Sequence, residues 1–158
     1  MSLNKPKIAI VGLGDTGGRI AGRIAEYGDV YIVNYDDWFK DYFKGYLFFK
    51  PERLDELIKV LLNYEQTMIV VGLGEDIVDS INSFLNNLEK LTVFAVKPFR
   101  AEKKKVKRAE KQLKLIGECV TWDLNVLLET MPNAPIGTAI DAFDDEITKE
   151  IKKYVKLG

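Results

Sequence analysis

The sequence contains no histidine and one cysteine, Cys119, in 158 residues. The absence of histidine excludes Ser-His and Cys-His catalytic pairs, histidine-ligated zinc and an imidazole proton shuttle. A single cysteine excludes a disulfide within the chain and is typical of a reducing compartment. No apolar run approaches the roughly 20 residues that span a bilayer, and the first residues lack the apolar core of a signal peptide. We therefore expect a cytoplasmic protein.

Neither sign of charge dominates, because 23 Lys and Arg residues are balanced by 24 Asp and Glu residues, for a formal net charge of -1. Such a balance provides no general attraction to nucleic acid or to an anionic membrane, and we expect neither as a partner. The chain is 47% hydrophobic, and a chain of this length buries roughly 70% of the surface that it exposes when unfolded. These proportions predict one globular domain, residues 1–158.

Short apolar runs alternate with segments of helical periodicity along the whole chain. Strands are predicted at residues 7–11, 30–33, 67–71, 91–96 and 119–122. Helices are predicted at residues 17–27, 51–63, 77–88, 102–116 and 136–155. Continuous apolar strands that alternate with helices indicate a parallel sheet covered on both faces. The predicted fold class is therefore α/β, with a three-layer, doubly wound and mostly parallel sheet.

A glycine-rich turn separates the first predicted strand from the first predicted helix, and it consists of Gly12, Leu13, Gly14, Asp15, Thr16, Gly17 and Gly18. Glycines let the backbone approach a phosphate, whose charge is met by the N–H groups and positive dipole end of the helix. Asp36 follows Gly17 at about the 20-residue spacing of a ribose-binding acid. This pattern satisfies the fingerprint of an NAD(P)-binding Rossmann domain. The alternative is a tight turn that binds nothing.

A second interpretation comes from the order of motifs along the chain. Residues 10–18 look like a first glycine loop, residues 31–36 like a strand that reads I-A-V-N-T-D, and residues 71–74 like the start of a second glycine loop. Residues 91–99, 125–129 and 135–147 then match a T-x-P-F turn, an N-D-x-L-L-E segment and the opening of a long central helix. In this collinear order the sequence resembles the nucleotide-binding domain of the FtsZ/tubulin superfamily, especially archaeal and bacterial FtsZ.

The resemblance implies a Rossmann-like domain that binds a guanine nucleotide, GTP or GDP, with magnesium as a further ligand. The residues that would then surround the nucleotide are the first loop (Gly12, Leu13, Gly14, Asp15, Thr16, Gly17 and Gly18), Asn34 and Asp36 on the ribose side, Gly72 and Gly74 of the second loop, and Asn125 and Asp144 at the base. It also implies a homodimer or an FtsZ-like protein as partner.

The second loop departs from the family pattern G-G-G-T-G-[ST]-G, because after Gly74 the chain continues with Glu75 and Asp76 and is several residues shorter. A carboxylate about 4 Å from a phosphate is repelled by up to roughly 4 kcal/mol at an effective dielectric constant of about 20. Bound magnesium would reverse this repulsion. Alternatively, Asp15, Glu75 and Asp76 cap free N–H groups of helices and occupy the anion site themselves.

The chain ends within or just after the central helix, so we expect neither the family's catalytic loop nor its C-terminal domain, and no robust GTP hydrolysis. The leading hypothesis is a guanine-nucleotide-binding module with a degenerate second loop. The alternatives are an NAD(P)-binding protein that uses Gly12, Gly14, Gly17 and Asp36, and a ligand-free interaction module with an aromatic surface. That surface would come from the aromatic residues at 38–49. The alternative for these residues is that they pack over the edge of the sheet. The basic run 103–111 is predicted to be a solvated helix face.

Overall fold

The computed structural model describes residues 7–35 and 46–157 and places six strands in one parallel sheet, in the order β3-β2-β1-β4-β5-β6. The strands are β1 (Ile8–Leu13), β2 (Asp29–Val33), β3 (Leu47–Phe49), β4 (Gln66–Gly72), β5 (Leu91–Lys97) and β6 (Val120–Asp123). Every pairing between them is parallel. The predicted α/β class and all five predicted strands are confirmed.

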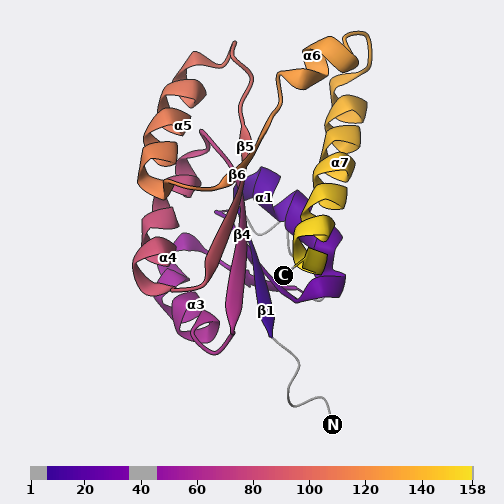
Figure 1. Cartoon of the computed structure of the whole chain (residues 1–158). Coiled ribbons are helices and arrows are strands. Elements are labelled where there is room, and N and C mark those ends of the chain that lie inside the picture. Colours follow the sequence, from indigo (N-terminus) through magenta and orange to yellow (C-terminus); the bar gives the residue numbers. More distant parts are fainter. Residues whose placement is uncertain (1–6, 36–45, 158) are drawn as a thin grey trace.

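Helices cover both faces of this sheet (Figure 1). They are α1 (Gly14–Ala21), extended by the 3-10 helix η1 (Gly22–Tyr27), then η2 (Pro51–Arg53), α3 (Leu54–Leu61), η3 (Asp76–Ser80), α4 (Ile81–Asn87), α5 (Lys103–Ile116), α6 (Val126–Thr130) and α7 (Ile136–Leu157). Helices α3, α4 and α5 lie on one face, and α1 and α7 lie on the other. Among the described residues, none of these helices combines the length and the apolar character needed to cross a bilayer.

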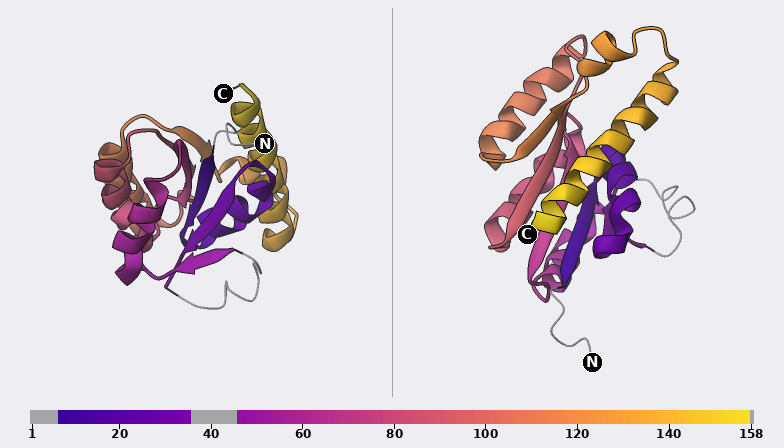
Figure 2. Two further views of the ribbon diagram at one scale, coloured as in Figure 1. Left: turned by 90° about the horizontal axis from the view of Figure 1, so that it is seen from below. Right: turned by 45° about the vertical axis from the view of Figure 1, so that its right-hand side comes forward.

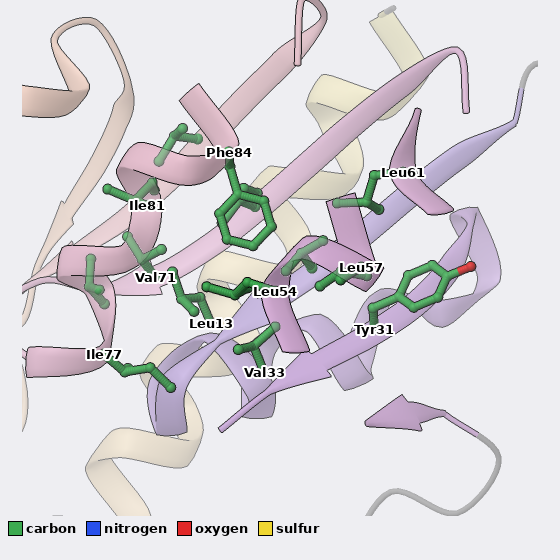
Figure 3. Close-up of a cluster of buried hydrophobic side chains, with 14 of the residues drawn as sticks. Leu13, Tyr31, Val33, Leu54, Leu57, Leu61, Val71, Ile77, Ile81 and Phe84 are labelled. Atoms are coloured by element: carbon green, nitrogen blue, oxygen red, sulfur yellow. The ribbon is translucent and has the colours of Figure 1, made fainter. Parts of the chain in front are cut away.

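The two faces of the sheet carry separate hydrophobic cores, because successive strand residues point in opposite directions. Leu13 and Val71 point toward α3 and α4, where they join Leu57 and Phe84 (Figure 3). Ile10 and its neighbours on the other face pack against α1 and α7. Burial on both sides explains why the strands read as continuous apolar runs rather than alternating ones.

The edge strand β3 was missed from the sequence, since Leu47, Phe48 and Phe49 belong to the aromatic stretch and not to an isolated apolar run. Phe49 is buried against the α3 face, whereas Tyr46 and Phe48 pack against the opposite core. The described end of the aromatic stretch therefore packs at the sheet edge, as predicted. Four of its members lie outside the described residues: Trp38, Phe39, Tyr42 and Phe43.

The order of the strands places the candidate site. The chain runs outward from β1 to β2 and β3 and then crosses back to β4 on the other side of β1. Ligands of open α/β sheets bind at such a switch point, beyond the carboxyl ends of the strands. The turn after β1 and the turn after β4 meet there, and α7 lies beside α1 next to them (Figure 2).

Candidate functional site

The turn after β4 delivers a carboxylate to the N-terminus of α1. The backbone N–H of Asp15 donates a hydrogen bond to Oε1 of Glu75 over 2.9 Å, and Thr16 donates further hydrogen bonds to the same carboxylate. One prediction from the sequence was that Glu75 caps the helix that follows it in the chain. The structure instead shows it capping α1, a helix 60 residues away in the chain. The first N–H groups and the dipole of a helix attract anions, and here the anion is the protein's own.

Two glycines make room for this carboxylate. A Cβ atom on Gly14 would lie 2.7 Å from Glu75 Oε1, and one on Gly72 would collide with Glu75 Oε2. Gly14 also has a φ of +88°, which favours glycine. We call Gly14, Gly72 and the N–H of Asp15 the glycine cradle.

Other glycines of the first turn serve packing. A Cβ atom on Gly17 would collide with the carbonyl oxygen of Val70, and one on Gly12 would lie 2.7 Å from the carbonyl oxygen of Gly17. Because Gly12 and Gly17 have no side chain, α1 can lie directly on the sheet. Gly12, Gly17, Gly18 and Leu13 are buried beneath the site, so the structure gives these four predicted ligand residues a packing position.

Helix α5 holds the turn after β4. The buried side chain of Gln112 accepts a hydrogen bond from the N–H of Gly74 over 2.8 Å and donates to the carbonyl oxygen of Glu75 over 2.9 Å. The same amide donates to Asp79 Oδ1. Gln112 was not predicted as part of the site, because a lone polar residue in a charged helix carries no signal in the sequence.

Burial raises the pKa of the Glu75 carboxyl above its ordinary value, and the negative charge of Asp15 adds to the rise. Hydrogen bonds from Asp15 and Thr16 oppose this shift without cancelling it. Glu75 therefore takes up a proton more readily than an exposed glutamate does.

Asn34, predicted on the ribose side, is engaged by the first turn. Its amide Nδ2 donates to Asp15 Oδ1 over 2.8 Å, and its Oδ1 accepts a hydrogen bond from the N–H of Tyr35 over 2.7 Å. Asn34 thus orients the Asp15 side chain at the mouth of the cradle. Asp36, the other predicted ribose contact, lies outside the described residues.

Asp144, predicted at the base, is buried and paired with α1. Its side chain is 2% exposed, and its Oδ2 lies 3.1 Å from Nε of Arg19 and 3.9 Å from Nη2 of Arg23. Burial raises the pKa of the Asp144 carboxyl, while the charge and hydrogen bond of Arg19 act in the opposite direction. Arg23 also pairs with the exposed Asp145. These contacts join α1 to α7.

Two open cavities extend from the cradle. One, of about 260 Å³, is lined by Glu75 and Thr16 as well as by Asp144, and Phe99 and Ile140 contribute apolar lining. The other, of about 390 Å³, is lined by Gly14, Asn34, Gly74 and Glu75, among others. Lys105 of α5 lines both cavities. The phosphate, ribose and base positions predicted from the first loop, Asn34 and Asp144 are therefore adjacent in space.

Asn125, which was predicted at the base, does not line either cavity. Its Oδ1 accepts the N–H of Arg100 over 2.9 Å, and its Nδ2 donates to Asp123 Oδ1 and to the carbonyl oxygen of Pro98. It thereby fixes the turn between β6 and α6 against the turn after β5.

Magnesium was a further predicted ligand. The described residues contain no group of three His, Cys, Asp or Glu side chains placed to hold a metal ion.

Two solved structures are similar to this chain over almost all of its length. The empty FtsZ dimer of M. jannaschii shares 21% identity, with a TM-score of 0.76 over 98% of this chain and 55% of the FtsZ chain. A point mutant of M. jannaschii FtsZ shares 20% identity, with a TM-score of 0.80 over 97% of this chain and 57% of the FtsZ chain. The chain has the FtsZ/tubulin-type fold. No protein-family model and no curated protein matches it.

The FtsZ/tubulin-type fold confirms the resemblance on which the sequence interpretation depended. This chain spans little more than half the length of the FtsZ chains that it matches. The strand order contains the switch point, and beside it Glu75 accepts the hydrogen bond of the first turn. Arg19 and Lys105, which line the cavities, were missed because single cations on helices are indistinguishable in the sequence from a solvated face.

Proposed function

We propose that this chain is a guanine-nucleotide-binding module of the FtsZ/tubulin-type fold that does not hydrolyse GTP robustly on its own. The supporting observation is the glycine cradle, in which a carboxylate accepts hydrogen bonds from the N-terminus of α1. A phosphate has the same charge sign and the same demand for N–H donors, so it competes with Glu75 for this position. Nucleotide binding then requires Glu75 to leave the cradle.

The cavity from Glu75 to Asp144 supports a guanine at its far end. A carboxylate there accepts two hydrogen bonds from the ring N–H and the exocyclic amino group of guanine, which adenine does not offer in that arrangement. Arg19 must release Asp144 for these bonds to form. Phe99 and Ile140 would provide apolar contact for the flat base.

The charges of this cavity support weak catalysis. Its lining holds four carboxylates, from Asp15, Glu75, Glu102 and Asp144, and two cations, from Arg19 and Lys105. Phosphoryl transfer depends on neutralised phosphate charge and on a positioned water molecule. A surplus of carboxylates repels the phosphates, so we expect binding to depend on Mg²⁺ and turnover to be slow.

The test is a calorimetric titration of GTP, GDP and ATP, with and without Mg²⁺, into the protein and its Glu75→Ala variant. We expect Glu75→Ala to bind GTP at least about tenfold more tightly, because the competing charge is gone. Asp76→Ala is the matched control, since Asp76 lines the neighbouring cavity without a hydrogen bond to the cradle. Absence of binding by both the protein and Glu75→Ala would overturn the proposal.

Asp144→Asn tests the base position. The amide cannot accept two hydrogen bonds in the way a carboxylate does, so GTP binding should weaken while any ATP binding stays unchanged. GTP affinity that survives this substitution would place the base elsewhere.

A second candidate function follows from the same contacts. Both polar anchors of a nucleotide are taken by side chains, the cradle by Glu75 and Asp144 by Arg19. We infer as the alternative a ligand-free module that associates with a second copy of itself, as the M. jannaschii FtsZ dimer does. Val126, Leu128 and Ile136 on α6 and the start of α7 are exposed and apolar. A shift from dimer to monomer on Leu128→Glu, in analytical ultracentrifugation, together with no nucleotide binding would favour this alternative.

A further inference from the structure

Helix α5, η3 and Gly74 of the turn after β4 line a third open cavity, of about 410 Å³. Its lining contains one acid, Asp79, and five cations: Lys104, Lys105, Lys107, Arg108 and Lys111. Lys104, Lys107, Arg108 and Lys111 are spaced i, i+3, i+4 and i+7, which places them on one stripe of the helix. We call this cavity with its seven lining residues the basic hollow.

Most of this positive charge is not neutralised locally. Arg108 lies 3.7 Å from Asp79, which also accepts a hydrogen bond from Gln112. Lys105 lies 3.4 Å from Glu102, which precedes the helix. In the part of the chain that the structure describes, Lys104, Lys107 and Lys111 form no ion pair within 4.0 Å. These cations are exposed, as the predicted solvated helix face requires, and five of them also line one hollow.

The volume and length of the basic hollow indicate which class of ligand it can bind. Its volume is that of a small-molecule site rather than of a flat nucleic-acid or protein surface. Lys104 and Lys111 are seven residues apart on α5, about 10 Å along the helix axis. A single phosphate contacts few of these cations at once, whereas a chain of linked phosphates can follow the whole stripe. Lysine ammonium groups bind phosphate as point charges and do not require the fixed geometry of an arginine pair.

We propose that the basic hollow binds an oligophosphate group of two or more linked phosphates. This proposal goes beyond the nucleotide site and does not depend on it. The group could belong to a nucleotide or to a free oligophosphate. Gly74, Lys105 and Arg108 line both the hollow and the cavity beside Glu75, so the phosphate tail of a nucleotide in that cavity has a continuous path to α5.

The experiment is a calorimetric titration of inorganic tripolyphosphate into the protein and two double variants. One variant, Lys107→Gln with Lys111→Gln, removes two cations of the hollow. The control, Lys103→Gln with Lys114→Gln, removes two exposed cations from the same helix that do not line the hollow. We expect the first variant to bind tripolyphosphate at least about tenfold more weakly and the control to stay within about twofold. Circular dichroism melting verifies that both variants fold.

Orthophosphate, GTP and guanosine separate the two sources. If GTP binds and the hollow variant weakens GTP but not guanosine, the oligophosphate is the tail of a nucleotide. If tripolyphosphate binds and GTP does not, the ligand is a free oligophosphate, and the proposed nucleotide function fails while this proposal stands.

Four results would overturn the proposal. The first three are no binding of tripolyphosphate, equal weakening by the hollow and control variants, and orthophosphate binding as tightly as tripolyphosphate. The fourth is displacement of tripolyphosphate by a single-stranded oligonucleotide of much higher affinity, which would assign the cations to nucleic acid. GTP binding that both double variants leave unchanged would leave the nucleotide function intact and remove the link to the hollow.

Discussion

The turn after β1 and the turn after β4 look alike in the sequence but have opposite roles. Each follows a buried strand, and each contains a glycine with positive φ, Gly14 at +88° and Gly74 at +94°. After the first turn α1 begins at once, so its N–H groups receive an anion. After the second turn the N–H of Gly74 is taken by Gln112, and Glu75 turns back toward α1. One turn receives an anion and the other supplies it.

This difference shows that glycines alone do not define a phosphate site. They provide space and conformational freedom. Whether that space holds a ligand depends on the next side chain, and at the second turn that side chain is a carboxylate of the protein. Substitutions that act on one turn at a time should separate the two roles.

The largest effect is expected from Gly17→Val in the first turn. Any Cβ at this position collides with the carbonyl oxygen of Val70, so α1 must move off the sheet. We expect a loss of at least about 3 kcal/mol in the free energy of unfolding, measured by urea denaturation. Gly137→Ala is the matched control, since a Cβ there meets nothing within 4 Å. The account of close packing fails if the two variants are equally stable.

The second-largest loss of stability is expected at the ion pair between Arg19 of α1 and Asp144 of α7. Arg19→Gln leaves the buried carboxylate of Asp144 with Arg23 at 3.9 Å as its remaining cation. Removing one partner of a buried pair costs about 3–5 kcal/mol, and the 33% exposure of the Arg19 side chain reduces this to about 2 kcal/mol. Asp145→Asn, which affects an exposed pair, should cost less than about 1 kcal/mol. Urea denaturation at pH 7 compares them, and a reversed order would contradict the assignment.

A smaller effect is expected from Gln112→Ala, which frees the second turn. The loss of the hydrogen bonds to Gly74 and Glu75 should cost about 1–2 kcal/mol and leave the first turn unchanged. Hydrogen exchange should accelerate at residues 72–80 and not at residues 12–18. Gln66→Ala, at an exposed glutamine of β4, is the control. Equal acceleration in both turns would show that they are not held separately.

The smallest effect is the pH dependence contributed by Glu75. Its pKa is raised in the folded protein, so the folded state binds this proton more tightly than the unfolded state does. Stability from this group therefore increases as the pH falls through the folded pKa toward the ordinary value of 4.5 and decreases as the pH rises. Glu75→Gln removes the titration. Between pH 7 and pH 5 the wild-type protein should gain stability relative to Glu75→Gln, and parallel profiles would contradict the prediction.

The sequence was sufficient for the fold because local and global signals agree. Buried strands such as β1 and β4 read as continuous apolar runs, and α3 carries its apolar residues on one stripe. The short strand β3 escaped prediction because its pairing with β2 is a long-range event that three aromatic and apolar residues do not encode locally. The start of α1 was placed three residues late, since Gly14 disfavours helix by propensity and tertiary packing overrides it.

The candidate site was only partly accessible from the sequence. The first turn, Asn34 and Asp144 were predicted to be adjacent, and the structure places them around connected cavities. That Glu75 caps α1 instead of its own helix depends on the adjacency of β1 and β4, which is a tertiary contact. The place of Asn125 also depends on tertiary contacts, because it does not line the cavities itself and its hydrogen bonds fix a turn whose Leu124 does.

The central claim is that the Glu75 carboxylate occupies the glycine cradle, and the amide proton of Asp15 reports on it directly. The measurement is a ¹H–¹⁵N NMR titration of that amide with pH, in the wild-type protein and in Glu75→Gln. We predict that the Asp15 amide shift follows a titration with an apparent pKa above 4.5 in the wild-type protein, and that this step is lost in Glu75→Gln. The same titration curve in both proteins would contradict the claim.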